Sequence, residues 1–184
     1  THAHIDHMGF AEQARSELGV AVRAHEQEVP VTEHPWRYDH ERSRVPYFRH
    51  PGFVKILTAM GAKGALGVKG TEEVRTYTEG QVLDVPGRPR VVFTPRHTHG
   101  HCALHFPDRG ALIAGDALVT LNTYTGRRGP QIVAGAATAD SRQALASLEA
   151  LAGLDVATTL CGHGEPWTQS LREAVDRARA AGPS

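Results

Sequence analysis

The sequence has few of the residues that would cross-link a fold or hold it at a membrane. Its 184 residues include only two cysteines, Cys102 and Cys161, which are too few for a disulfide framework and favour a reducing compartment such as the cytoplasm. No apolar run is long enough to cross a bilayer. The 20 basic side chains are balanced by 20 acidic ones. We therefore expect no nucleic-acid partner and no membrane partner.

Histidine, in contrast, is abundant. The chain has 12 histidines, about three times the number that composition leads us to expect in a domain of this size. They concentrate in the opening THAHIDH and in the segment RHTHGH that begins at Arg96. Because clustered imidazoles are typical of metal sites, the composition indicates a metal-binding protein.

The hydrophobic pattern predicts strands that alternate with helices. Strands are expected at 20–24, 74–78, 81–85, 91–95, 102–106, 111–115 and 156–160, and helices at 8–18, 51–60, 139–152 and from Pro166 onward. Residues 26–45 show no period, and long irregular segments of this kind tend to be functional. The alternation predicts a layered α/β domain with polar motifs at the ends of strands, where such folds place their sites.

The first motif lies at the start of the sequence. His2, His4 and Asp6 alternate, so on an extended segment all three would project to the same side, with His7 brought round by the turn that follows. This one segment can offer two imidazoles to one metal ion, and a carboxylate with an imidazole to a neighbouring ion.

Three further candidate ligands follow predicted strands. His97 stands in the loop after 91–95, and His163 stands after 156–160. Asp116 ends the apolar run ALIAGD, and a carboxylate that emerges from a buried strand is costly unless cations accompany it. His99 and His101 either support the ligands through hydrogen bonds or face solvent. These nitrogen and oxygen donors suit zinc, iron or manganese.

Taken in order, these motifs resemble a known family. They are similar to the motifs of the metallo-β-lactamase fold superfamily, in particular its glyoxalase II-like hydrolases. The motifs are HIDH preceded by His-Ala, then TPRHTHGH, IAGDAL and CGHG. The resemblance implies an αββα sandwich with a dinuclear metal site at one edge, most simply two zinc ions. It implies His2, His4 and His97 on the first metal, Asp6, His7 and His163 on the second, and Asp116 as the bridge.

The sequence departs from the family pattern at its beginning. In this family, strands of the first half of the sandwich precede the HxHxDH motif, whereas here the motif is the start of the sequence. We therefore expect residues 1–184 to form a single metallo-β-lactamase-like domain whose N-terminal strands lie upstream of Thr1.

The resemblance implies a dinuclear metal-dependent hydrolase acting on a small molecule with an ester, thioester or lactone bond. A hydroxide that bridges the two metals would attack the carbonyl. Asp6 and Asp116 are the expected catalytic residues: Asp6 orients the hydroxide and accepts its proton, and Asp116 bridges the metals. Two alternatives remain: a mononuclear iron sulfur dioxygenase of the same fold, and a metal-stabilised binding domain without catalysis.

Four aromatic residues in the irregular region suggest a lid over the substrate. Trp36, Tyr38, Tyr47 and Phe48 lie among charged residues between positions 30 and 53. We expect this group to cover an apolar part of the substrate, with Trp36 or Phe48 lining the pocket.

A fifth aromatic residue is singled out by comparison with lactonases of the same family. Those enzymes carry a tyrosine three residues after the aspartate that corresponds to Asp116, where this sequence has Val119. Tyr124 lies nearby in the sequence, and we expect it to contact the substrate.

Overall fold

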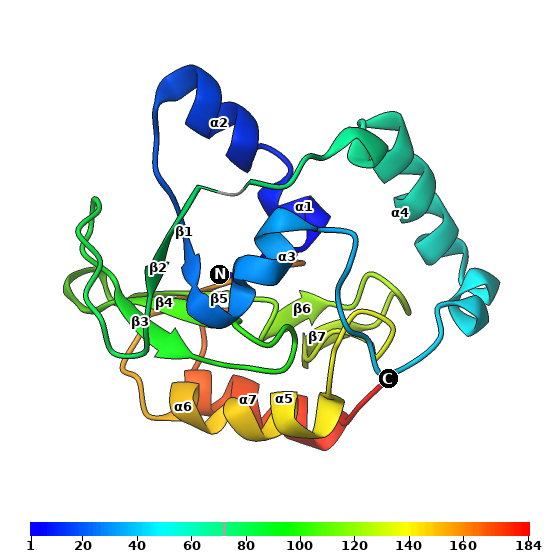
Figure 1. Ribbon diagram of the computed structural model, residues 1–184. Helices are drawn as coiled ribbons and strands as arrows, with labels where there is room; N and C mark the ends of the chain where they lie inside the picture. Colours follow the sequence, from blue (N-terminus) through cyan, green and yellow to red (C-terminus); the bar gives the residue numbers. More distant parts are fainter. Residues whose placement is uncertain (72) are drawn as a thin grey trace.

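A four-stranded mixed sheet lies at the centre of the molecule (Figure 1). The structure is a computed structural model and describes residues 1–71 and 73–184. The strands follow the order β3 (Arg90–Phe93), β4 (Cys102–Phe106), β5 (Ala111–Gly115) and β8 (Thr158–Cys161). Pairing is antiparallel from β3 to β5 and parallel between β5 and β8. Strands β3, β5 and β8 therefore run in one direction and end at the same edge of the sheet.

Three helices cover one face of this sheet, as Figure 1 shows: α5 (Ser141–Ser147), α6 (Glu149–Ala152) and α7 (Leu171–Ala181). The side chains of Asp140 and Ser170 cap α5 and α7 by accepting backbone N–H bonds from the first turn. The main core is apolar and lies between the sheet and these helices. Its fully buried members are Ala103, Leu112, Ala114, Leu118, Leu148, Leu151, Ala174, Val175 and Ala178.

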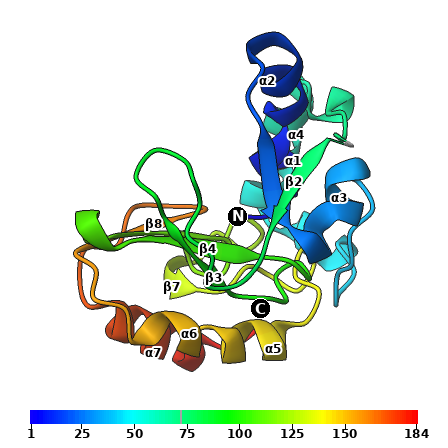
Figure 2. The ribbon, with the colours of Figure 1, turned by 60° about the vertical axis from the view of Figure 1, so that its left-hand side comes forward.

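The N-terminal elements lie on the other side of the sheet (Figures 1 and 2). They comprise the helices α1 (Ile5–Met8), α2 (Ala11–Leu18), α3 (Val29–Glu33) and α4 (Pro51–Ala62), and the parallel strand pair β1 (Val22–His25) and β2 (Val74–Tyr77). A second, antiparallel pair consists of β6 (Val119–Leu121) and β7 (Arg128–Gln131). Short 3₁₀ turns occur at Glu26–Glu28, Val45–Arg49, Ala65–Gly67 and Pro107–Arg109. Among the described residues, no helix has the length and apolar character needed to cross a membrane.

Several sequence predictions agree with this architecture. The strands expected at 91–95, 102–106 and 111–115 correspond to β3, β4 and β5, and the helix expected at 51–60 corresponds to α4. The buried stripe of α7 consists of predicted residues: Leu171, Ala174, Val175 and Ala178. The mixed α/β class is confirmed.

Two predicted elements are wrong in extent. Residues 81–85 form no strand and make only one bridge, between Val82 and Arg90. Pro86 and Pro89, which have no backbone N–H to donate, interrupt the pairing nearby. The last helix begins at Leu171 rather than at Pro166, because the backbone of Trp167 exchanges two hydrogen bonds with Thr159 at the edge of the sheet.

Two segments have more structure than their sequence suggested. The region 26–45 contains α3 in place of a wholly irregular chain, and its Pro30 lies in the first turn, where a missing N–H costs nothing. The motif HIDH is not extended throughout, because α1 begins at Ile5 directly after His4. Asp6 and His7 consequently project from a helical turn, while His2 and His4 precede it.

Candidate metal centre

The seven predicted ligands converge at one edge of the central sheet. His97, Asp116 and His163 follow β3, β5 and β8, the three strands that end at this edge. The segment that carries the other four residues, His2, His4, Asp6 and His7, lies against the same edge through α1. The common direction of the three strands explains why motifs more than 60 residues apart in sequence meet in space.

The Asp116 carboxylate lies at the centre of the cluster. Its Oδ2 atom is 3.4 Å from His97 Nε2 and 3.3 Å from His163 Nε2, and its Oδ1 atom is 3.3 Å from His7 Nε2. His163 Nε2 is also 3.3 Å from Asp6 Oδ2. Three groups of donor atoms, each with its atoms within 4.8 Å of one another, could hold a metal ion: His2 with His4 and His97, His2 with His7 and Asp116, and Asp6 with His7 and His163.

The buried imidazoles are uncharged at neutral pH. Burial lowers the pKa of His2 and His97 well below the usual range and lowers the pKa of His4 to about 4. His97 Nε2 lies only 3.1 Å from His4 Nδ1. His2 Nε2 is buried and has no hydrogen-bond partner among residues 1–71 and 73–184. Neutral imidazoles whose nitrogens face one another or lack a partner are suited to share a cation, so these residues fit a metal ion.

In the more exposed part of the cluster, the pKa of the histidine is raised rather than lowered. Although burial disfavours protonation of His163, the carboxylates of Asp116 and Asp6 raise its pKa to about 10. Burial also disfavours the Asp116 carboxylate, but hydrogen bonds from His163 and His7 outweigh this and hold its pKa well below the usual range. A cation would take the place of the proton in these pairs, because metal binding and proton release are coupled.

Hydrogen bonds behind the cluster orient His97 and support Asp116 through His101. The Thr138 hydroxyl donates to the Val133 carbonyl at 2.9 Å and therefore accepts from His97 Nδ1 at 3.3 Å, which leaves the lone pair of His97 Nε2 facing the cluster. His101 is fully buried, and its Nε2 atom accepts the Asp116 backbone N–H at 3.0 Å. His101 thus supports the centre, whereas His99 pairs at the surface with Asp39 at 2.8 Å.

A buried glutamate, which the sequence did not indicate, connects the N-terminal histidine segment with the loop after β3. Glu28 accepts hydrogen bonds from Ala3 N at 2.8 Å, Thr98 Oγ1 at 2.8 Å and Gly100 N at 3.0 Å. Ala3 stands between His2 and His4, and Thr98 follows His97. A Cβ atom at Gly100 would lie 2.5 Å from the Glu28 backbone nitrogen, which explains the glycine in HTHGH. No local pattern in the sequence marks Glu28 as part of the centre.

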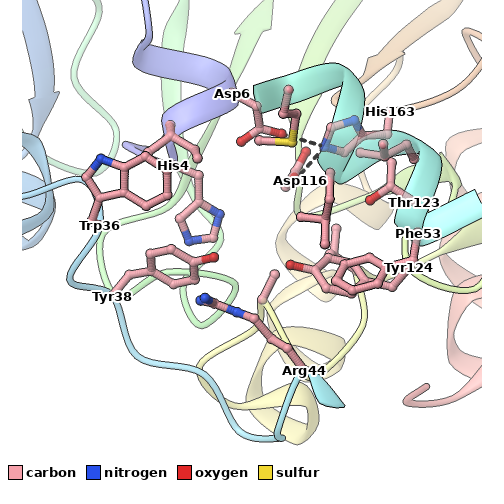
Figure 3. A pocket seen from close by; sticks show the side chains of 16 residues that line it. His4, Asp6, Trp36, Tyr38, Arg44, Phe53, Asp116, Thr123, Tyr124 and His163 are labelled. Atoms are coloured by element: carbon pink, nitrogen blue, oxygen red, sulfur yellow. Dashed lines mark ion pairs between the residues drawn. The ribbon is translucent and has the colours of Figure 1, made fainter. Parts of the chain in front are cut away.

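A cavity of about 360 Å³ opens directly onto the cluster (Figure 3). His4, Asp6, Asp116 and His163 form its polar end. The remaining wall comes mainly from the 36–60 region and from the segments around β6 and β7, and its residues are Ile5, Trp36, Tyr38, Arg44, Phe53, Ile56, Leu57, Met60, Thr123, Tyr124, Val133 and Ala137. The wall is largely apolar and aromatic, as in sites for small organic molecules.

The predicted substrate contacts divide between this cavity and its surroundings. Trp36 and Tyr124 line it, but Phe48 does not, and the Phe48 ring contacts Phe53 edge-on with centroids 5.3 Å apart. The phenylalanine that lines the cavity is Phe53. The sequence did not single it out, because it lies in the expected helix rather than in the irregular segment. Tyr47 is buried and packs on the Tyr124 ring.

Comparison with known proteins identifies the family. The model of the metallo-beta-lactamase superfamily matches residues 1–163. The chain belongs to this superfamily. It is 28% identical over 177 residues to the probable metallo-hydrolase YflN of Bacillus subtilis, covering 91% of this chain and 64% of that protein. A 31-residue stretch is 58% identical to hydroxyacylglutathione hydrolase of Gloeobacter violaceus, covering 17% of this chain and 12% of that protein.

Solved structures of the superfamily share its fold. A metallo-beta-lactamase family protein of Thermus thermophilus, TTHA1429, aligns with TM-score 0.59 and 24% identity over 97% of this chain and 58% of its own. The di-iron-bound form of TTHA1623 aligns with TM-score 0.61 and 25% identity over 94% of this chain and 72% of its own. The chain spans less than two thirds of the length of YflN and of TTHA1429. The resemblance to the superfamily seen in the sequence is confirmed, and the fold implies bound metal ions.

Proposed function

We propose that this member of the superfamily is a hydrolase that uses two metal ions, most simply zinc, to cleave an ester, thioester or lactone in a small molecule. One observation carries the proposal: a single carboxylate, Asp116, stands between two sets of donor atoms, and an apolar cavity opens on that point. The matches to a probable metallo-hydrolase and, over a short stretch, to a thioester hydrolase support the same reaction class.

In this proposal one ion would be held by His2, His4 and His97, the other would be held by Asp6, His7 and His163, and Asp116 would contact both. Iron and manganese suit the same donors. When bound, two such ions supply a hydroxide nucleophile near neutral pH and polarise the substrate carbonyl. No serine or cysteine nucleophile is required.

Asp6 has the position needed to handle a proton. It lines the cavity, and its carboxylate is 3.3 Å from His163 Nε2. Burial works against ionisation of Asp6, but His163 and His7 more than compensate and keep its pKa below the usual value. The carboxylate can therefore accept a hydrogen bond from the attacking water, orient it and take its proton. The apolar wall positions the acyl group and excludes water from the reacting carbonyl.

Metal content and hydrolysis test the proposal together. Elemental analysis of protein that has never met a chelator should find two metal ions per chain. The same preparation should hydrolyse at least one compound in a panel of aryl esters, thioesters and lactones. One equivalent of iron with oxygen consumption on a persulfide substrate would replace the proposal with a dioxygenase. Tightly bound metal with no turnover in any assay would indicate a binding domain.

A further inference from the structure

One cation stands in the wall of the substrate cavity. Within the described part of the chain, Arg44 is the only lysine or arginine in the cavity lining, and Figure 3 shows its guanidinium close to the Tyr38 ring. No carboxylate oxygen of residues 1–71 or 73–184 lies within 4.0 Å of its nitrogens. Its one hydrogen bond in that part runs from Nε to the Ala136 carbonyl at 3.4 Å. Most of its five N–H donors therefore remain free for a ligand.

Tyr38 holds this guanidinium in place and relates it to the metal centre. The Arg44 Cζ atom lies 5.0 Å from the Tyr38 ring centroid, within the range of a cation–π contact. Tyr38 also packs on the His4 ring, with centroids 4.1 Å apart. Stacking restrains the plane of a guanidinium but leaves its N–H edges exposed. The free edges of Arg44 thus lie about one aromatic ring away from a predicted metal ligand.

The charges around the cavity favour a negatively charged occupant. Its two acidic lining residues, Asp6 and Asp116, are the carboxylates that would be neutralised by the bound metal ions. The side chains of α4 that line the cavity, Phe53, Ile56, Leu57 and Met60, are apolar. A ligand that fills the space therefore meets cations at one end, an apolar wall along its side, and Arg44.

We infer that Arg44 binds a carboxylate of the substrate. This inference rests on the proposed function. The substrate class is then a hydrolysable acyl compound with an apolar segment and a carboxylate that reaches Arg44 while the scissile carbonyl lies at the metal centre. A guanidinium recognises a carboxylate through two parallel N–H···O bonds, so Arg44 determines specificity without touching the reacting atoms.

A matched pair of substrates tests this inference. The 4-nitrophenyl monoester of adipic acid carries a terminal carboxylate, and 4-nitrophenyl hexanoate ends in a methyl group at the same chain length. For Arg44→Gln we expect KM for the adipate monoester to rise about tenfold or more, as for loss of a charge-assisted pair, and KM for the hexanoate to change less than twofold. Arg44→Lys should recover part of the loss. Arg42→Gln is the matched control, because Arg42 is exposed in the same segment and does not line the cavity.

Equal changes for both esters would overturn the inference and leave Arg44 as a support for Tyr38. Equal effects of the Arg42 and Arg44 variants would also overturn it, since they would indicate general surface charge.

A binding assay separates this inference from the proposed reaction. Trp36 lines the cavity, so its fluorescence reports occupancy, and Trp36→Phe supplies the blank. The metal-loaded protein should bind 4-phenylbutyrate more tightly than the neutral 4-phenylbutanamide, and Arg44→Gln should remove most of that preference. If no ester is hydrolysed but this preference is found, the proposed function fails and the Arg44 subsite stands. If esters are hydrolysed without any such preference, the subsite fails alone.

Discussion

The two sides of the cavity are built in different ways. At the metal side, the two deepest residues stand at strand ends and are buried, His97 being only 1% exposed and Asp116 3% exposed. Much of the opposite wall comes from residues 36–60, which include α4, and Trp36 in this segment is 48% exposed. In the proposed hydrolase, the sheet would therefore position the metal ligands, while the 36–60 segment would position the substrate.

The attachment of that segment shows how weak the restraint is. Its backbone is fastened to the body of the domain by Glu41 N to Thr138 O at 2.8 Å and Arg42 N to Gly135 O at 3.0 Å. Beyond them, α4 buries only Phe53 and leaves Val54 and Leu57 partly exposed. Elements with few buried contacts open at low cost in free energy, so we expect α4 to open more readily than the metal side.

The largest effect should come from breaking the metal side at its centre. Asp116→Ala removes the carboxylate between the two donor sets and, if two metal ions bind as proposed, would leave the two cations to repel each other. We expect activity to fall more than about 1,000-fold, in line with several kcal/mol of lost charge stabilisation. His99→Ala, at the surface, should cost less than about threefold. Comparable losses in the two variants at equal metal content would contradict the assigned roles.

Removal of the metal ions should destabilise the metal side selectively. Five histidines and two aspartates packed together gain from cations. Loss of a ligand that was present at about 1,000 times its Kd costs about 4 kcal/mol. For a chain of this size, the Tm should fall by about 8 °C or more on chelation and recover when zinc is returned. Calorimetry measures the shift. An unchanged Tm would argue against metal at this cluster.

A substitution at Glu28 should have a smaller effect on the metal side. Glu28→Gln keeps the volume of the side chain but removes one of its two acceptor oxygens and its charge, which loosens the contact between Ala3 and the loop after His97. Metal affinity should fall about 10- to 100-fold, as for other groups that orient ligands. Competition with a fluorescent zinc chelator measures it. The matched control is Glu33→Gln, at an exposed site in α3, and an equal loss there would refute the role.

The smallest effect is expected on the wall. Trp36→Ala removes an aromatic surface from the cavity without touching the metal residues. We expect KM for long-chain esters to rise about three- to tenfold, which corresponds to about 1 kcal/mol of lost apolar contact, while KM for acetyl esters stays nearly constant. Steady-state kinetics across a chain-length series measure it. A uniform change at all chain lengths would remove Trp36 from substrate recognition.

Local patterns in the sequence were enough to predict much of the fold and the candidate ligands. The apolar runs that became β3 and β5, and the stripe along α7, are readable because periodicity reflects which residues face a core. The pairing of polar motifs with strand ends also follows from sequence order. The wall was harder, because Phe48 and Phe53 are equally aromatic, and only the direction of α4 decides which of them faces the cavity.

The sequence alone was enough to predict the candidate donor set, because HAHIDH, the histidine after β3, the aspartate after β5 and the histidine after β8 form one recognisable series. Only the tertiary structure decided how Glu28 contacts both Ala3 and Gly100, and how Tyr38 lies between His4 and Arg44. The physical reason is that hydrophobic periodicity is a local property. Contacts between residues far apart in the chain depend instead on how the packed elements lie relative to one another.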